Sequence, residues 1–278
     1  MTAEASSSPI KVGVVGLGAI GREICKAVDS GMEGFQLVAV TDRKIEFAMK
    51  FAASLSQKTP FVDISEMLDM VDLVVESASQ QAVREVAIPT LKRGKSILIM
   101  SVGALLDEEL FKEVKTLSRE NNCRVYLPSG AITGLDGLKS ASIGKITSVT
   151  LTTRKPPSSL KGALYLKEKG FDLDSLEEEK VIFIGSAGEA VKLFPANVNV
   201  AASISIAGIG QENTKVRIVA DPALSKNTHE IHVEGEFGEF RTRVENVPSP
   251  FNPKTSYLAA LSAIATLKKI AEPIQVGT

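Results

Sequence analysis

Cysteine is scarce in this chain of 278 residues, which contains only Cys25 and Cys123. Two cysteines cannot build the disulfide framework of a small secreted protein, and so low a number fits a reducing compartment. We therefore expect a cytoplasmic protein in which both cysteines fill the hydrophobic core.

An excess of charge of one sign is also missing, because the formal net charge is −1 and basic residues do not cluster. This balance gives no electrostatic footprint for nucleic acid or for an anionic membrane surface. No segment is apolar for long enough to span a bilayer. We therefore expect no nucleic acid and no membrane among the partners. A small-molecule substrate and a homodimer are separate expectations, which the charge balance does not itself supply.

Histidine is equally rare, and both histidines, His229 and His232, lie in the stretch NTHEIHVEGEFGEF. Apolar and polar residues alternate there, which predicts a strand; the apolar set is Ile231, Val233 and Phe237. Successive side chains of a strand point to opposite faces. An odd separation therefore puts His229 on the apolar face and His232 on the acidic face, so the pair cannot bind one metal ion. We expect no metal site here.

A glycine-rich turn follows the first apolar segment, over residues 10–15, and reads GLGAIG. Glycines at these positions allow a tight turn, a close approach of the backbone to a pyrophosphate, and close packing of the next helix. The helix REICKAV follows and would direct its free N–H groups toward phosphates. A strand before the turn and a helix after it are the context that a dinucleotide site requires. The predicted cofactor-binding residues are Gly16, Gly18, Ala19, Ile20 and Gly21.

An acidic residue ends the second predicted strand, FQLVAVTD. Asp42 lies where a carboxylate accepts hydrogen bonds from the ribose hydroxyls of NAD, and its charge would repel the additional phosphate of NADP. Arg43 could instead turn toward that phosphate. The sequence thus predicts NAD as the cofactor and leaves NADP open.

Strands and helices continue to alternate up to residue 143, which predicts a doubly wound (Rossmann) domain of the α/β class over residues 9–143. In such a sheet the loops after the strands face the cofactor. Ser77, Ala78 and Ser101 begin two of these loops and are predicted to contact the dinucleotide. Ser129 begins a third and is assigned to the substrate.

Longer alternating strands follow and predict a second, α+β domain over residues 144–251. A final helix is predicted over residues 252–270, with Asn252 as its N-cap and Pro253 in its first turn. We expect this helix to pack back on the first domain.

Several quoted motifs together resemble the L-aspartate dehydrogenases: GLGAIG, ESASQQAV, SVGAL, PSGAITGLDGLKSAS, LTTRK, FPANVNVAAS, NTHEI, GEFGEF and NPKTSYLAALSAI. The resemblance covers nearly the whole chain. It implies NAD(P)-dependent oxidative deamination of L-aspartate, through iminoaspartate, to oxaloacetate and ammonia, with the imine supplied to NAD biosynthesis.

The resemblance also implies roles for single residues. His229 takes the catalytic position of the family, Ala131 and Asn199 take positions that contact the cofactor, and Asn227 lines the substrate pocket. A histidine titrating near neutral pH can move the protons of this reaction.

A dicarboxylate substrate requires cations as well. Lys139 and Arg154 are the assigned residues, with Lys155 and Lys254 as further candidates.

Three alternatives remain open at this point. A semialdehyde dehydrogenase needs a cysteine nucleophile over the nicotinamide, and neither cysteine starts such a loop. A sugar or polyol oxidoreductase usually carries Glu-Lys-Pro where this chain has IMSVGA. A regulatory module that binds NADH without turnover would show no absorbance change with amino acids.

Overall fold

The computed structural model describes residues 8–160, 165–166, 169–173, 175–194 and 198–278. The chain divides into two compact units. The first comprises Met1–Pro128 and Ala260–Gln275, and the second comprises Ser129–Ala259 and Val276–Thr278. Among the described residues, no helix combines the length and the apolar character needed to cross a membrane.

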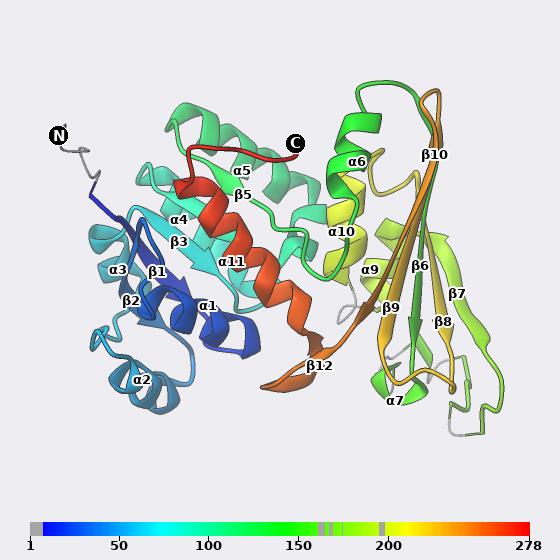
Figure 1. Ribbon diagram of the computed structural model, residues 1–278, viewed down its shortest axis with the longest axis horizontal. Coiled ribbons are helices and arrows are strands. Elements are labelled where there is room, and N and C mark those ends of the chain that lie inside the picture. The colour runs from blue at the N-terminus through cyan, green and yellow to red at the C-terminus, as the bar shows by residue number, and fades with distance from the viewer. Residues whose placement is uncertain (1–7, 161–164, 167–168, 174, 195–197) are drawn as a thin grey trace. The chain divides into compact units, whose positions relative to one another are not determined.

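The first unit is built on a parallel sheet with the strand order β2-β1-β3-β4-β5 (Figure 1). Its strands are β1 (Ile10–Val15), β2 (Phe35–Thr41), β3 (Leu73–Glu76), β4 (Ser96–Ile99) and β5 (Val125–Tyr126). The helical elements between them are α1 (Ala19–Asp29), α2 (Ile45–Ser54), α3 (Ile64–Met70), α4 (Gln80–Lys92), η1 (Val102–Leu106) and α5 (Glu108–Glu120). The doubly wound fold predicted from the alternation of elements is thus confirmed.

The direction of winding reverses between β1 and β3. The chain first adds β2 on one side of β1 and then crosses to build β3, β4 and β5 on the other side. Beyond β2, Phe61 forms an isolated parallel bridge to Val40. Ligands of such sheets bind beyond the carboxyl ends of the strands at the point of reversal, so the loops after β1 and β3 are the place to look for a site.

The second unit contains a mixed sheet with the strand order β10-β9-β6-β8-β7. Its strands are β6 (Ile146–Lys155), β7 (Lys180–Ser186), β8 (Thr214–Ala220), β9 (Asn227–Gly235) and β10 (Gly238–Asn246). Helices α6 (Leu135–Ala141), α9 (Ala187–Leu193) and α10 (Val198–Ala207) lie along one face, and a short helix, α7 (Pro157–Leu160), follows β6 (Figure 1). The hydrophobic core lies between that face and the helices, with Leu138, Leu151, Ile204 and Ile231 all buried.

The division of the chain falls earlier than the sequence indicated, after Pro128 rather than after residue 143. Ile132 and Leu138 belong to the core of the second unit, which explains why the segment that carries them joins it. The apolar residues around α6 look alike in the sequence whichever core they enter.

The last predicted helix also begins later than expected. Residues Asn252–Ser256 form strand β12, paired antiparallel with β11 (Pro248–Ser249), and helix α11 runs from Tyr257 to Ala271. Asn252 is therefore not an N-cap, because the local hairpin extends the backbone through Pro253. Most of α11 belongs to the first unit. A side chain placed on Gly34, in the loop before β2, would come within 2.8 Å of the Ala271 Cβ.

Candidate functional site

The loop after β1 has the geometry that a pyrophosphate requires. Gly16 adopts a φ of +90°, and a Cβ there would lie 2.6 Å from the backbone of Ala78. A Cβ on Gly21 would lie 1.9 Å from the Gly16 carbonyl oxygen, whereas a Cβ on Gly18 would meet nothing within 4 Å. The outer two glycines therefore close the turn against the protein, and Gly18 leaves open space in front of the first turn of α1. Ala19 and Ile20 begin that turn and carry its free N–H groups.

Asp42, just after β2, holds the same loop. One carboxylate oxygen accepts a hydrogen bond from the Leu17 N–H at 2.7 Å, and the other accepts from the Lys44 N–H at 2.8 Å. A carboxylate oxygen has lone pairs for a second donor, so Asp42 can still accept from a ribose hydroxyl. The neighbouring Arg43 is exposed.

The serines predicted to contact the cofactor use their hydroxyl groups within the protein. Ser77 donates to the Gly16 carbonyl at 2.7 Å, and Ser101 donates to the Glu76 carboxylate at 2.9 Å. Glu76 ends β3 and is completely buried; it begins the motif ESASQQAV, but the sequence assigned it no role. Only the backbone near Ser77 and Ser101 and the exposed Ala78 remain for a ligand. Taken together, these loops fit a dinucleotide, with an open approach at Gly18 and a carboxylate at the end of the second strand.

In the second unit, a cluster of polar side chains lies at one end of the otherwise apolar face of the sheet. His229 on β9 lies directly opposite Thr153 on β6, and the imidazole Nδ1 is 3.0 Å from the Thr153 hydroxyl. Lys155 follows two residues after Thr153 and therefore shares its face. All three side chains are buried. Asn227, two residues before His229, completes the cluster on that face.

The charges in this cluster are strongly perturbed. Burial, together with the nearby Lys155 ammonium, lowers the pKa of His229 from 6.5 to about 3. Burial lowers the pKa of Lys155 from 10.5 to about 8. At neutral pH the cluster therefore holds a neutral imidazole beside a largely protonated lysine. The sequence led us to expect a histidine that titrates near neutral pH, whereas the fold lowers the pKa of His229 well below that range.

Asn227 contributes a side-chain oxygen that accepts no hydrogen bond from the described residues. This atom, Oδ1, is buried. A buried acceptor left unsatisfied costs about 1–3 kcal/mol, so such atoms commonly have a functional explanation. Its cross-strand neighbour Asn246 is buried and donates to the Ala131 carbonyl at 3.0 Å, which ties the loop carrying Ala131 to the end of β10.

The cations assigned from the sequence lie elsewhere. Arg154 precedes Lys155 and hence points to the opposite face of β6, where it forms an ion pair with Glu179. Lys139 is exposed on α6, while Ser129 is half-buried at the start of the second unit and Asn199 is exposed in the first turn of α10. The side chain of Lys254 lies outside the described residues. Of the candidate cations whose side chains are described, Lys155 is the one that lies close to His229.

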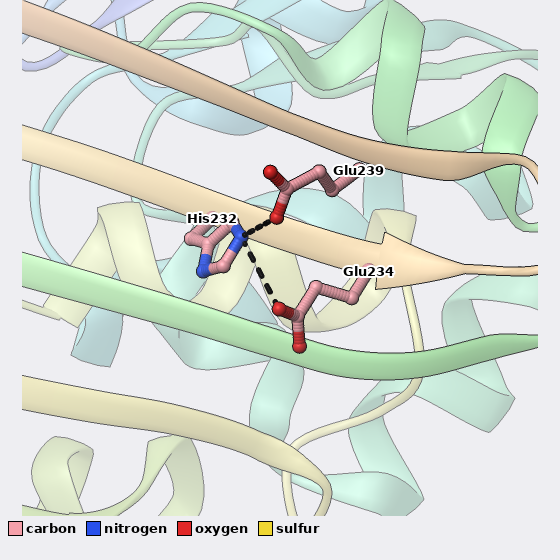
Figure 2. A group of neighbouring side chains, drawn as sticks. All are labelled: His232, Glu234 and Glu239. Carbon is pink, nitrogen blue, oxygen red and sulfur yellow. Dashed lines mark hydrogen bonds and ion pairs between the residues drawn. The ribbon is translucent and has the colours of Figure 1, made fainter.

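The other histidine confirms the parity argument. His232 lies on the opposite face of β9, where its Nε2 is 3.0 Å from a carboxylate oxygen of Glu239 and 3.5 Å from one of Glu234. Figure 2 shows both carboxylates converging on this one nitrogen. Arg241 also reaches Glu239, at 3.8 Å. The alternation does not extend to Phe237, which lies in the turn after β9 and is exposed.

Comparisons with known proteins match the two units separately. Residues 16–128 match a family described as the NAD-binding domain of homoserine dehydrogenase, and residues 136–270 match the C-terminal domain of aspartate dehydrogenase. An L-aspartate dehydrogenase of Methanosarcina mazei is 57% identical over 97% of this chain and 100% of its own length.

Solved structures give the same answer. The crystal structure of aspartate dehydrogenase from Thermotoga maritima matches with a TM-score of 0.76 and 32% identity, covering 96% of this chain and 99% of that one. The scyllo-inositol dehydrogenase of Lactobacillus casei, at 15% identity and a TM-score of 0.58 over 95% of this chain and 87% of its own, shares the fold alone. The protein is an NAD(P)-dependent oxidoreductase with NAD as its cofactor. The chain belongs to the L-aspartate dehydrogenase family.

Proposed function

We propose that this protein oxidises L-aspartate with NAD, through iminoaspartate, to oxaloacetate and ammonia, or runs the reverse reaction. The observation that carries the proposal is the buried cluster of His229, Thr153, Lys155 and Asn227, which combines a neutral base, a cation and an unsatisfied acceptor. These groups are suited to bind one carboxylate and the amino group of an amino acid and to move its protons. The relatives named for this activity support the same substrate.

Lys155 is the residue that we assign to a substrate carboxylate. A buried ammonium attracts a carboxylate far more strongly than an exposed one does, because little water screens the pair. Its lowered pKa of about 8 leaves it mostly charged at neutral pH. The Asn227 Oδ1 is suited to accept a hydrogen bond from the substrate ammonium group.

His229 is the residue that we assign to proton transfer. When bound, NAD supplies the acceptor for the hydride of the α-carbon. The amino group must lose a proton in that step, and water must be deprotonated to attack the imine. The Thr153 hydroxyl orients the ring through Nδ1, which leaves Nε2 to exchange these protons. The negative charge of the substrate beside Lys155 offsets the repulsion that holds the His229 pKa low, so binding makes His229 a better base.

The assay for this proposal is the formation of NADH from L-aspartate and its consumption with oxaloacetate and ammonia. His229→Ala should lower turnover about 100-fold or more, the range for losing a positioned acid–base group, while NADH still binds. His232→Ala, on the exposed face, should leave turnover unchanged. A much better reaction with malate or with a sugar would show that the substrate is wrong.

The cation assignment has its own test. Lys155→Met should raise the KM for L-aspartate at least about tenfold, since a buried carboxylate would lose its partner. Lys215→Met, at an exposed position on β8, is the control and should leave the KM unchanged. A larger effect of Arg154→Met than of Lys155→Met would favour the cation first assigned from the sequence.

The proposal also covers the location, the oligomeric state, the use of the product and the cofactor preference. We propose a cytoplasmic homodimer that supplies iminoaspartate to NAD biosynthesis and accepts NADP less well than NAD. The small number of cysteines fits a reducing compartment, and Asp42 supports the cofactor preference. Sedimentation equilibrium measures the oligomeric state, and a mass of one chain at micromolar concentration would exclude the dimer.

A further inference from the structure

Glu76 is a buried carboxylate at the carboxyl end of the central strand β3. Its side chain is completely inaccessible to solvent. One carboxylate oxygen accepts hydrogen bonds from the Ala78 N–H at 2.8 Å, the Ser79 N–H at 3.2 Å and the Ser101 hydroxyl at 2.9 Å. The other oxygen accepts from the Ser101 N–H at 3.0 Å. One side chain thus holds the loop after β3 and the loop after β4.

Most of the partners of Glu76 can only donate. Three of the four are backbone N–H groups, which can only donate, and the fourth is a hydroxyl. Both carboxylate oxygens therefore act as acceptors toward the backbone of two loops. In the described part of the chain no cationic side chain forms an ion pair with it. The carboxyl group is held by backbone N–H groups and one hydroxyl.

Burying the Glu76 carboxyl group does not favour the stability of the fold. Burial raises the pKa of Glu76 despite the four hydrogen bonds, which means that the folded protein holds the anion less well than water does. What this carboxyl group supplies is the fixed position of the two loops that it bonds.

The next residue extends the connection to a third loop. The Ser77 hydroxyl donates to the carbonyl of Gly16 at 2.7 Å and lies within 3.2 Å of the carbonyl of Val15. Glu76 and Ser77 together therefore join the glycine loop after β1, the loop after β3 and the loop after β4. These are the loops at the carboxyl edge of the sheet where its winding reverses.

We propose that Glu76 is a positioning residue for the cofactor: its carboxylate fixes the backbone of residues 77–79 and 101 in the conformation that receives NAD. The inference rests on NAD as the cofactor and does not depend on the identity of the substrate. Glu76 itself contacts no ligand in this role. It acts through the loops, so its loss should weaken dinucleotide binding more than it slows the chemical step.

The test is NADH affinity, measured by fluorescence on the full chain without substrate. In Glu76→Gln an amide NH₂ replaces one acceptor and faces the N–H donors, so at least one bond is lost. We expect the Kd of NADH to rise about tenfold or more, the effect of one hydrogen bond to a charged group. Glu113→Gln is the matched control, because it removes a partly buried carboxylate on α5 that forms an ion pair with Arg84 on α4. It should leave the Kd unchanged.

Two more measurements separate positioning from general stability. Amide exchange at Ala78 and Ser79 should accelerate about tenfold in Glu76→Gln, while exchange at Val75, inside β3, stays as in the unmodified protein. At saturating NAD, kcat should fall by less than the KM for NAD rises. An unchanged Kd, or a uniform acceleration of exchange through the sheet, would overturn the proposal.

Ser101→Ala decides the question if Glu76→Gln does not fold. It removes the hydroxyl donor and keeps the carboxylate, and we expect the Kd of NADH to rise about threefold. An unchanged Kd in this variant refutes the positioning role. Failure of the unmodified protein to bind NADH would instead contradict the cofactor assignment, and failure to oxidise L-aspartate with NADH binding intact would contradict only the substrate.

Discussion

The neutral state of His229 predicts a specific sensitivity of the folded protein to acid. Its pKa is held at about 3, against an ordinary value of 6.5. Between these values the unfolded chain binds a proton that the folded chain does not, so the free energy of unfolding falls as the pH falls. From pH 7 to pH 5 the loss from His229 is about 2 kcal/mol, since each pH unit below the ordinary pKa contributes about 1.4 kcal/mol.

The perturbation that isolates this effect is His229→Gln, which keeps a polar side chain beside Thr153 but cannot be protonated. Urea unfolding at pH 7 and pH 5 gives the free energy of unfolding that is lost on acidification. Carboxylates contribute to this loss equally in each variant, so the difference between variants reports the histidine. We expect that loss to be about 2 kcal/mol smaller in His229→Gln than in the unmodified protein. Lys215→Met, at an exposed position on β8, is the control and should keep the loss as in the unmodified protein.

Nuclear magnetic resonance tests the same reasoning directly. Because the chain has only two histidines, the signal that His229→Gln removes assigns both imidazoles. The His229 signal should not titrate between pH 8 and pH 5 in the protein without substrate. A midpoint near 6.5, or an equal loss of stability in His229→Gln and the unmodified protein, would falsify the claim that burial beside Lys155 keeps the ring neutral.

Further predictions concern the first unit. Asp42→Ser should lower the ratio of catalytic efficiency with NAD to that with NADP, and steady-state kinetics with both cofactors would show an unchanged ratio if Asp42 does not contact the ribose. Gly21→Ala should destabilise the protein by on the order of 3 kcal/mol in urea unfolding, because its Cβ would overlap the Gly16 carbonyl. Gly18→Ala, with open space around its Cβ, should keep the stability and weaken NADH binding; a loss of stability in both would contradict the assigned geometry. Cys25, fully buried with a raised pKa, should react with maleimide only after unfolding, which mass spectrometry detects.

The sequence by itself determined the class of fold and the placement of the two histidines. Apolar strands alternating with helices leave few arrangements other than a parallel sheet, and the glycines of GLGAIG fix where a dinucleotide approaches it. Strand parity placed His229 and His232 on opposite faces, because the period of two is a property of the extended backbone itself. Such inferences depend only on neighbours in the chain.

Tertiary structure decided the features that depend on residues far apart. Strand register places Thr153 opposite His229, 76 residues away, and only this pairing selects Lys155 rather than Arg154 as the cation of the cluster. The low pKa of His229 follows from that burial and that charge, neither of which is visible in NTHEI. Glu76 likewise acquires its role from Ser101, on a different loop. Hydrogen bonding, desolvation and Coulomb interactions depend on distances in space, and the sequence sets those distances only through the completed fold.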